Sequence, residues 1–205
     1  FDLLSKKLNM KEGRKNFPIV SFGENDILQF STNLLGKLFT AISKRKTICI
    51  NYQPFGKEKK SYEIYPYLLR QYNRRWFLLA TPVGNEVEPY REEFIANFAL
   101  DRMAPDFEYL EDIPYVDTPV DLDARFKEIV GVTLYEDRDV EDIYFAVSPA
   151  SANYVRSKLI HRTQMEAEGD ELEYFRTKYP QFDDWAFFSI ECRPNPELYS
   201  LLSSY

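Results

Sequence analysis

The chain has 205 residues, of which 44% are hydrophobic and 16% aromatic; this supplies a packed core and excludes a mostly disordered protein. No apolar run reaches the roughly 18 residues that a membrane span needs, so no membrane association is expected. Two cysteines are too few for a disulfide framework, which favours a reducing cytoplasm. One histidine and seven isolated glycines exclude a His-rich metal cage and a phosphate-binding glycine loop. We therefore expect no metal, no cofactor and no catalytic residue, because no nucleophile–base pair can be assembled.

The formal net charge of −7 conceals two halves of opposite sign. Residues 1–103 carry 17 Lys and Arg against 11 Asp and Glu, whereas residues 104–205 carry 9 against 22. The basic excess is densest over residues 37–75. This pattern is compatible with a first half that binds a polyanion. It is equally compatible with lysines that keep a small sheet soluble.

The first half is predicted to form a helix and then a small β-barrel. Leu34, Leu35, Leu38 and Ile42 fall at helical spacing, which predicts a helix over residues 32–44. Short apolar, β-branched segments separated by turn residues follow, and Pro66 should lie at an edge or a bend of its strand. The predicted strands cover residues 47–52, 61–69, 75–80 and 94–100, with a fifth around Phe107.

The second half has a different pattern, in which helices and strands alternate. Residues 111–120 hold two prolines and three acids and are predicted to be a linker. Residues 121–205 are predicted to form an α+β sandwich that stops short of its last strand. Its predicted elements are a helix over 121–130, a strand over 140–147, a helix over 150–160, a hairpin over 163–179, a strand over 185–192 and a helix over 196–205.

Five segments, in this order and at this spacing, resemble the WYL-domain family. That family is named for a Trp-Tyr-Leu strand, which here is Trp76-Phe77-Leu78. The resemblance covers residues 34–110, and the C-terminal part resembles the extension that often follows WYL domains. The five segments are Ala41-Ile42, Ile50-Asn51-Tyr52, Ile64-Tyr65-Pro66-Tyr67-Leu68-Leu69, Arg74-Arg75-Trp76-Phe77-Leu78 and Phe98-Ala99-Leu100-Asp101-Arg102-Met103.

The resemblance implies an α+β architecture with an Sm-like (SH3-type) β-barrel over residues 37–110, a linker over 111–120 and the extension over 121–205. WYL domains are sensor modules that usually follow an N-terminal helix-turn-helix in bacterial transcriptional regulators. Some members bind single-stranded nucleic acid. By resemblance, residues 1–36 are a connector from a missing DNA-binding domain, through which operator DNA would be a partner. A homodimer is also expected.

Candidate ligand-binding residues come from both halves of the chain. Tyr52 could stack on a base or be ordinary packing at a strand end. The arginines beside the turn before Trp76, together with Arg102 of the Asp101-Arg102 pair, could contact phosphates or be solvated. Asp101 is expected to be structural and Trp76 to lie in the core. The full set of candidates is Tyr52, Arg70, Arg74, Arg75, Arg102, His161 and Arg162.

Two of these candidates, His161 and Arg162, lie where the extension of the family usually has a His-containing segment. His161 could contact a phosphate or cap a helix. One departure weakens the nucleic-acid hypothesis: family members often carry an arginine where this chain has Ala96.

The sequence therefore predicts an effector-sensing module of a bacterial transcriptional regulator, not an enzyme, that binds a single-stranded nucleic acid or a small anionic effector on its barrel. The acidic second half could hold the basic face in the unliganded state. The alternative is a dimerisation module with no ligand of its own.

Overall fold

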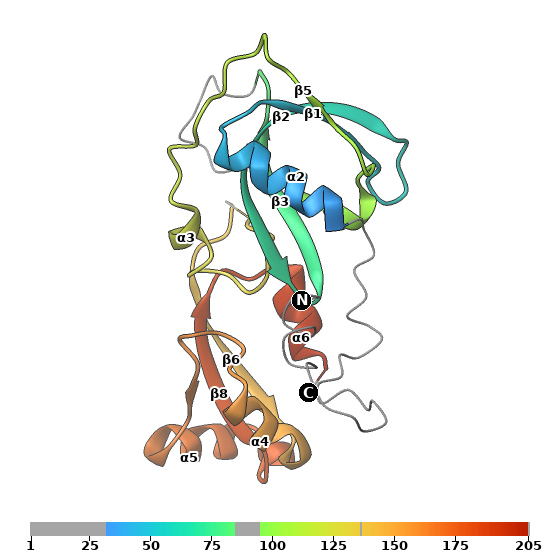
Figure 1. The fold of residues 1–205 in the computed structure, drawn as a ribbon. Helices are drawn as coiled ribbons and strands as arrows, with labels where there is room; N and C mark the ends of the chain where they lie inside the picture. Colours follow the sequence, from blue (N-terminus) through green and yellow to red (C-terminus); the bar gives the residue numbers. More distant parts are fainter. Residues whose placement is uncertain (1–31, 85–94, 136, 205) are drawn as a thin grey trace, which may run out of the picture.

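The computed structural model describes residues 32–84, 95–135 and 137–204, which form two units of mixed helices and antiparallel strands (Figure 1). In the first unit, α2 (Thr32–Ser43) packs on a five-stranded sheet of order β4-β3-β2-β1-β5. A 3-10 helix, η3 (Leu100–Arg102), separates the last two strands. The strands are β1 (Ile48–Tyr52), β2 (Lys60–Tyr72), β3 (Arg75–Pro82), β4 (Ala96–Ala99) and β5 (Glu108–Tyr109).

The predicted helix is confirmed, and its apolar stripe explains how it packs. Leu34, Leu38 and Ala41 are fully buried because their spacing of three to four residues places them on one face. That face meets the buried side chains of Ile48 and Ile50 and of the neighbouring strands to form the core of the first unit. All five predicted strands are present, with bounds that differ by a few residues.

β2 is longer than predicted and passes through Pro66. The register of its pairing with β3 shifts between Pro66 and Leu68, so the proline lies at a bulge. β2 then continues to Tyr72, and a two-residue turn at Asn73 and Arg74 leads into β3. Both turn residues have positive φ, 45° and 63°, as tight hairpin turns of this type require.

The sheet is not closed into a barrel by strand pairing among the described residues, since β4 and β5 are its two edges. The chain after η3 instead joins the end of β1. Met103 forms an isolated bridge with Tyr52, and the Ala104 amide donates to the Asn51 carbonyl at 2.9 Å. The short helical turn ends the β4 ladder before it could meet β5, which explains the difference from the expected barrel.

The predicted linker, residues 111–120, has no regular secondary structure, yet it packs closely against the first unit. The Tyr115 ring makes edge contacts with Tyr65 and Tyr67, and its hydroxyl donates to the Pro66 carbonyl at 2.8 Å. Burial raises the pKa of Tyr115 to about 12. The segment therefore behaves as a strap on β2.

The second unit contains a three-stranded sheet of order β6-β8-β7. Helices α4 and α6 bury one face of this sheet, and α5 packs on the other through Phe175 and Phe187. The strands are β6 (Glu141–Val147), β7 (Met165–Glu166) and β8 (Ala186–Cys192). The helices are α3 (Leu122–Arg125), α4 (Pro149–Ser157), α5 (Gly169–Lys178), η4 (Pro180–Phe182) and α6 (Pro196–Leu202).

Two predictions for this unit are wrong. The helix predicted over 121–130 is only the short α3, although Asp121 caps it as expected by accepting from two backbone amides. The hairpin predicted over 163–179 is a short β7 followed by α5. Leu172 and Phe175 lie on the buried side of α5 at helical spacing, and acidic residues at its start and basic residues at its end suit the helix dipole.

The two units share apolar contacts. Leu79 of β3 packs with Phe126 and Ile129, and Tyr72 at the end of β2 packs against Leu198 of α6 and its neighbours. Figure 1 shows the β2–β3 hairpin extending from the first unit to α6. Within the described part of the chain, no helix is long and apolar enough to cross a membrane.

Candidate functional site

A groove of about 410 Å³ lies at the end of β1 in the first unit, between the turn that follows this strand and η3. Backbone hydrogen bonds hold the two walls together, because the Gln53 amide donates to the Arg102 carbonyl at 3.2 Å. The turn contains Pro54 and Gly56, and Gly56 has a φ of 67°, a conformation that side chains rarely adopt. The lining residues are Gln53, Pro54, Phe55, Gly56, Lys59, Asp101, Arg102, Met103 and Ala104.

An exposed aromatic ring with two arginines beside it dominates this groove. Phe55 is 69% exposed, although a lone phenylalanine at a turn would normally be buried. The guanidinium of Arg102 lies 4.2 Å from the centre of its ring, and that of Arg75 lies 5.7 Å away. The two cations therefore gather around one solvent-facing aromatic surface.

Asp101 fixes the position of one of these arginines. Its Oδ2 atom accepts from Nη2 of Arg75 at 2.8 Å, and its side chain is only 12% exposed, against 42% for Arg75. The pairing follows from the antiparallel register of β3 and β4, in which Phe77 lies opposite Ala99. Arg75 is two residues before Phe77, and Asp101 is two residues after Ala99. Oδ1 of Asp101 and Nε of Arg102 are buried without a hydrogen-bond partner among the described residues.

Tyr52 supports the groove from beneath. Its side chain is 6% exposed and makes edge contacts with Tyr62 and Phe98, at centroid distances of 6.3 and 5.1 Å. Burial raises the pKa of its hydroxyl. The guanidinium of Arg102 lies 5.4 Å from the centre of its ring. Tyr52 is thus a core residue whose ring contacts the guanidinium of Arg102, and Phe55 is the ring available for stacking.

Phe55 is not among the residues that the sequence predicted for the site, and Lys59 was expected only as part of the basic excess over residues 37–75. The Gln53–Gly56 segment has a clear turn signal, and turn residues rarely carry a functional aromatic side chain. A large apolar side chain at the tip of a predicted turn, flanked by lysines, was the available signal. Phe55 can be recognised as part of a site only because the sheet brings Arg75 and Arg102 beside its ring.

The structure separates the other predicted arginines from this groove. Arg74 is exposed at the tip of the β2–β3 hairpin. Arg70 lies 3.6 Å from the centre of the Phe126 ring, between the two units, and burial lowers its pKa. Arg70 therefore joins the units through a cation–π contact and does not face the groove.

The two predicted residues of the extension also lie elsewhere. His161 is buried, with Nδ1 2.7 Å from the Thr163 hydroxyl and Nε2 3.0 Å from the Lys127 carbonyl oxygen. Burial lowers its pKa. Both ring nitrogens are engaged, so this histidine connects segments of the second unit. Arg162 is exposed on the same unit.

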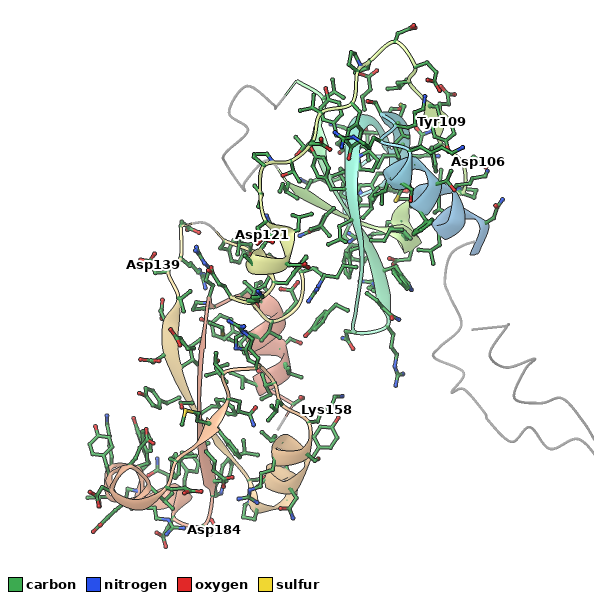
Figure 2. All side chains as sticks on the ribbon, turned by 60° about the vertical axis from the view of Figure 1, so that its left-hand side comes forward. Asp106, Tyr109, Asp121, Asp139, Lys158 and Asp184 are labelled. Atoms are coloured by element: carbon green, nitrogen blue, oxygen red, sulfur yellow. The ribbon has the colours of Figure 1, made fainter. Side chains whose placement is uncertain are left out.

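Acidic residues in and near the strap pair with basic residues of α2 and of the segment that follows it. Arg45 pairs with Asp117, Lys46 with Glu111 and Lys37 with Asp106. Figure 2 shows Asp106 beside α2 and Asp121 at the start of α3, between the two units. The acidic residues of these three pairs thus come from residues 106–117, and none of them comes from residues 121–205.

The comparisons with known proteins can be set beside this geometry. Residues 33–105 match the family model of the WYL domain. This match starts in α2, includes the five segments noted in the sequence and ends just after the groove. The chain contains a WYL domain.

A solved structure similar to the chain is proteasome accessory factor B/C (PafBC) of Arthrobacter aurescens. The identity is 14% and the TM-score 0.42, over 98% of this chain and 27% of that one. The chain thus spans about a quarter of the length of PafBC, and the likeness is too weak to carry an argument. No curated protein matches the chain.

Within the WYL domain, the structure shows where the Trp76-Phe77-Leu78 strand and Ala96 lie. Trp76 is half-buried against the first core, as predicted, and Leu78 is fully buried. Ala96 begins β4, opposite Ala80, and packs against the same core. The two arginines beside the Phe55 ring thus come from β3 and η3, and Lys59 comes from the segment between β1 and β2.

Proposed function

We propose that the chain is the effector-sensing part of a bacterial transcription regulator, and that its WYL groove binds a single-stranded nucleic acid or another anionic ligand. The observation that carries this proposal is the exposed Phe55 ring with Arg75 and Arg102 beside it. A nucleobase stacks on an exposed aromatic face, and guanidinium groups donate to phosphate oxygens in a fixed fork. No catalytic step is part of this proposal.

The buried polar atoms of the groove suit a ligand that binds between its walls. Among the described residues, Nε of Arg102 has no hydrogen-bond partner, and Lys59 lines the groove. An anionic ligand would supply the acceptor that this guanidinium lacks. Asp101 opposes anion binding by its charge, but it also orients Arg75 toward Phe55. The site is thus suited to a ligand with a planar ring and at least one phosphate or carboxylate.

The acidic residues of the strap would compete with a long polyanion for the cations near α2, and this competition would regulate its binding. The pairs of Lys46 with Glu111 and Arg45 with Asp117 occupy cations that a long polyanion would otherwise meet. Such exposed pairs are worth about 0 to 1 kcal/mol each and weaken with salt. A long nucleic acid would therefore compete with Glu111 and Asp117 for these cations, whereas a short ligand confined to the groove would not.

A fluorescence-anisotropy titration with a labelled, mixed-sequence single strand at about 50 and about 200 mM salt tests the proposal. Binding that weakens steeply with salt is expected. Arg102→Ala and Phe55→Ala should each weaken it at least about tenfold, as hot-spot residues do. The matched control is Arg162→Ala, which removes an exposed arginine of the second unit and should leave affinity unchanged.

Two results would count against the groove. Absence of binding at the lower salt concentration rejects the nucleic-acid version, and a small anionic ligand then becomes the one to seek. Equal losses from Arg102→Ala and Arg162→Ala would show that binding follows overall charge. The second candidate function, dimerisation without a ligand, predicts a stable dimer whose Phe55→Ala variant is unchanged.

A further inference from the structure

The two units meet at a joint, which is formed by β2, β3 and β4 on one side and by residues 122–134 and α6 on the other. Leu79 packs with Phe126 and Ile129. Tyr72 packs in the apolar cluster of α6, where Figure 1 shows the β2–β3 hairpin meeting this helix. The hydrophobic effect that holds such surfaces together is not directional. Directional polar contacts are therefore needed to fix how the two units are aligned.

Two asparagine side chains hold residues 130–133, one from each unit. Nδ2 of Asn97, in β4, donates to the Val132 carbonyl at 2.8 Å. Asn195, which caps α6, is fully buried. Its Nδ2 atom donates to the backbone carbonyls of the first and last residues of this segment, both at 2.8 Å. Residues 130–133 are therefore a direct hydrogen-bonded connection between β4 of the WYL domain and the start of α6.

At its other end, β4 supports the WYL groove. Phe98, which follows Asn97, makes an edge contact with Tyr52 at a centroid distance of 5.1 Å. The guanidinium of Arg102 lies 5.4 Å from the centre of the Tyr52 ring. β4 also leads directly into η3, which supplies Asp101 and Arg102 to the wall of the groove. A displacement of β4 would therefore move both the aromatic support of the groove and one of its walls.

Two polar side chains of the joint are only half satisfied among the described residues. Oε1 of Glu197 accepts from the Thr133 hydroxyl at 2.6 Å, but Oε2 of Glu197 is buried without a hydrogen-bond partner. In the same way, Nδ2 of Asn97 donates to Val132, whereas Oδ1 of Asn97 is buried without a partner. Buried polar atoms without partners raise the free energy of the arrangement that contains them. A displacement that gives these atoms a partner or water therefore costs less at this joint than at an apolar one.

We propose that the joint has two arrangements, the one described and a displaced one, and that a ligand in the WYL groove favours the first. Occupancy of the groove is thereby coupled to residues 130–133 and α6. The response to a ligand rests on the proposed function, whereas the coupling itself does not. Such coupling is reciprocal. Weakening the joint must therefore loosen the groove and lower its affinity, although neither Asn97 nor Thr133 lines it.

Amide hydrogen exchange of the full chain, followed by NMR, tests the coupling without a ligand. Thr133→Val keeps the shape of the side chain and removes the hydroxyl that donates to Glu197. The Ala104 amide, which donates to the Asn51 carbonyl beside the groove, should then exchange about two- to tenfold faster, the range for the loss of one hydrogen bond. Amides of the β1–β2 ladder report global stability and should change less. The matched control is Thr177→Val on the exposed side of α5, which should leave the Ala104 amide unchanged.

Two measurements with the labelled, mixed-sequence single strand test the response to a ligand. The strand should slow exchange of the Leu198 amide in α6, which donates to Oδ1 of Asn195 at 2.8 Å. Asn97→Ala removes the donor to Val132 and should weaken binding about two- to tenfold, the same range as above. Asn153→Ala is the matched control, because it removes an exposed asparagine of α4 and should leave the affinity unchanged.

The outcomes separate the coupling from the proposed function. Binding of the strand with no change at the Leu198 amide and no effect of Asn97→Ala overturns the coupling and leaves the groove as a binding site. Absence of binding, together with faster exchange at Ala104 in Thr133→Val, rejects the nucleic-acid ligand and supports the coupling. Equal exchange rates at Ala104 in Thr133→Val and Thr177→Val overturn the coupling, whether or not the strand binds.

Discussion

Asp101→Asn should lower the stability of the protein while it raises the affinity of the groove for an anion. The side chain of Asp101 is 12% exposed and accepts from Arg75, which is 42% exposed. A hydrogen bond to a charged group contributes about 1.5 to 3 kcal/mol, and the exposure of Arg75 favours the lower end of this range. A loss of about 1.5 kcal/mol corresponds to a thermal midpoint about 3 to 6 °C lower for a chain of this size.

The effect on binding has the opposite sign, because the substitution removes a negative charge from the wall of the groove. For a phosphate about 7 Å away, the Coulomb energy at a dielectric constant between about 50 and 80 is about 0.6 to 1 kcal/mol. Affinity should therefore rise about three- to fivefold. Thermal unfolding and the anisotropy titration measure the two effects on the same protein.

The matched control is Asp106→Asn, which removes the same charge from the same unit. Asp106 is 78% exposed and, within the part of the chain that the structure describes, pairs with Lys37 alone, so the midpoint should change by less than about 1 °C. If Asp101→Asn weakens binding, Asp101 acts chiefly by holding Arg75 in place, and the argument from charge is wrong. If the midpoint does not change, the Arg75 contact does not stabilise the fold.

Four further substitutions test contacts away from the WYL groove. Burial lowers the pKa of His161, so below about pH 6.5 the unfolded chain binds a proton that the folded chain does not. Stability should fall as the pH drops from about 7 toward 5, and urea midpoints of His161→Gln should fall less steeply. Arg70→Met keeps the packing on Phe126 and should change stability by less than about 1.5 kcal/mol without changing affinity for a single strand, whereas Phe126→Ala should cost about 3 to 5 kcal/mol in urea unfolding. Gly131→Ala should cost at least about 1 to 3 kcal/mol in the same assay, because φ is 91° and the new Cβ would lie 2.8 Å from Cγ of Glu197.

The candidate site was predictable from the sequence only in part. Arg75 and Arg102 could be named because they belong to short segments whose order matches a known family. Arg70 lies in the same basic segment beside the β2–β3 turn as Arg75. Its side chain nevertheless packs on Phe126, which is more than fifty residues away in the chain. Nothing in the neighbourhood of Arg70 indicates that partner, because the contact is formed by the packing of one unit on the other.

The misassigned segment of the second unit shows a related limit. Between Glu171 and Tyr179, apolar residues occur at spacings compatible with either a strand or a helix. The tertiary structure decides in favour of α5, because Phe175 can then stack on Phe187 at a centroid distance of 5.1 Å. Short apolar segments are ambiguous in this way because their periodicity extends over too few residues.

By itself, the sequence determined the helix with its apolar stripe and the short strands, because each depends on spacing within about ten residues. It also determined the uneven charge, which depends on composition alone. Only the tertiary structure decided that Phe55 is the exposed ring, that Tyr52 is a core residue against Arg102, and that residues 106–117 supply the acids that pair with Lys37, Arg45 and Lys46. These features join residues 20 to 72 positions apart. Such contacts exist only after the sheet and its neighbours pack, since burial and register, not local preference, select them.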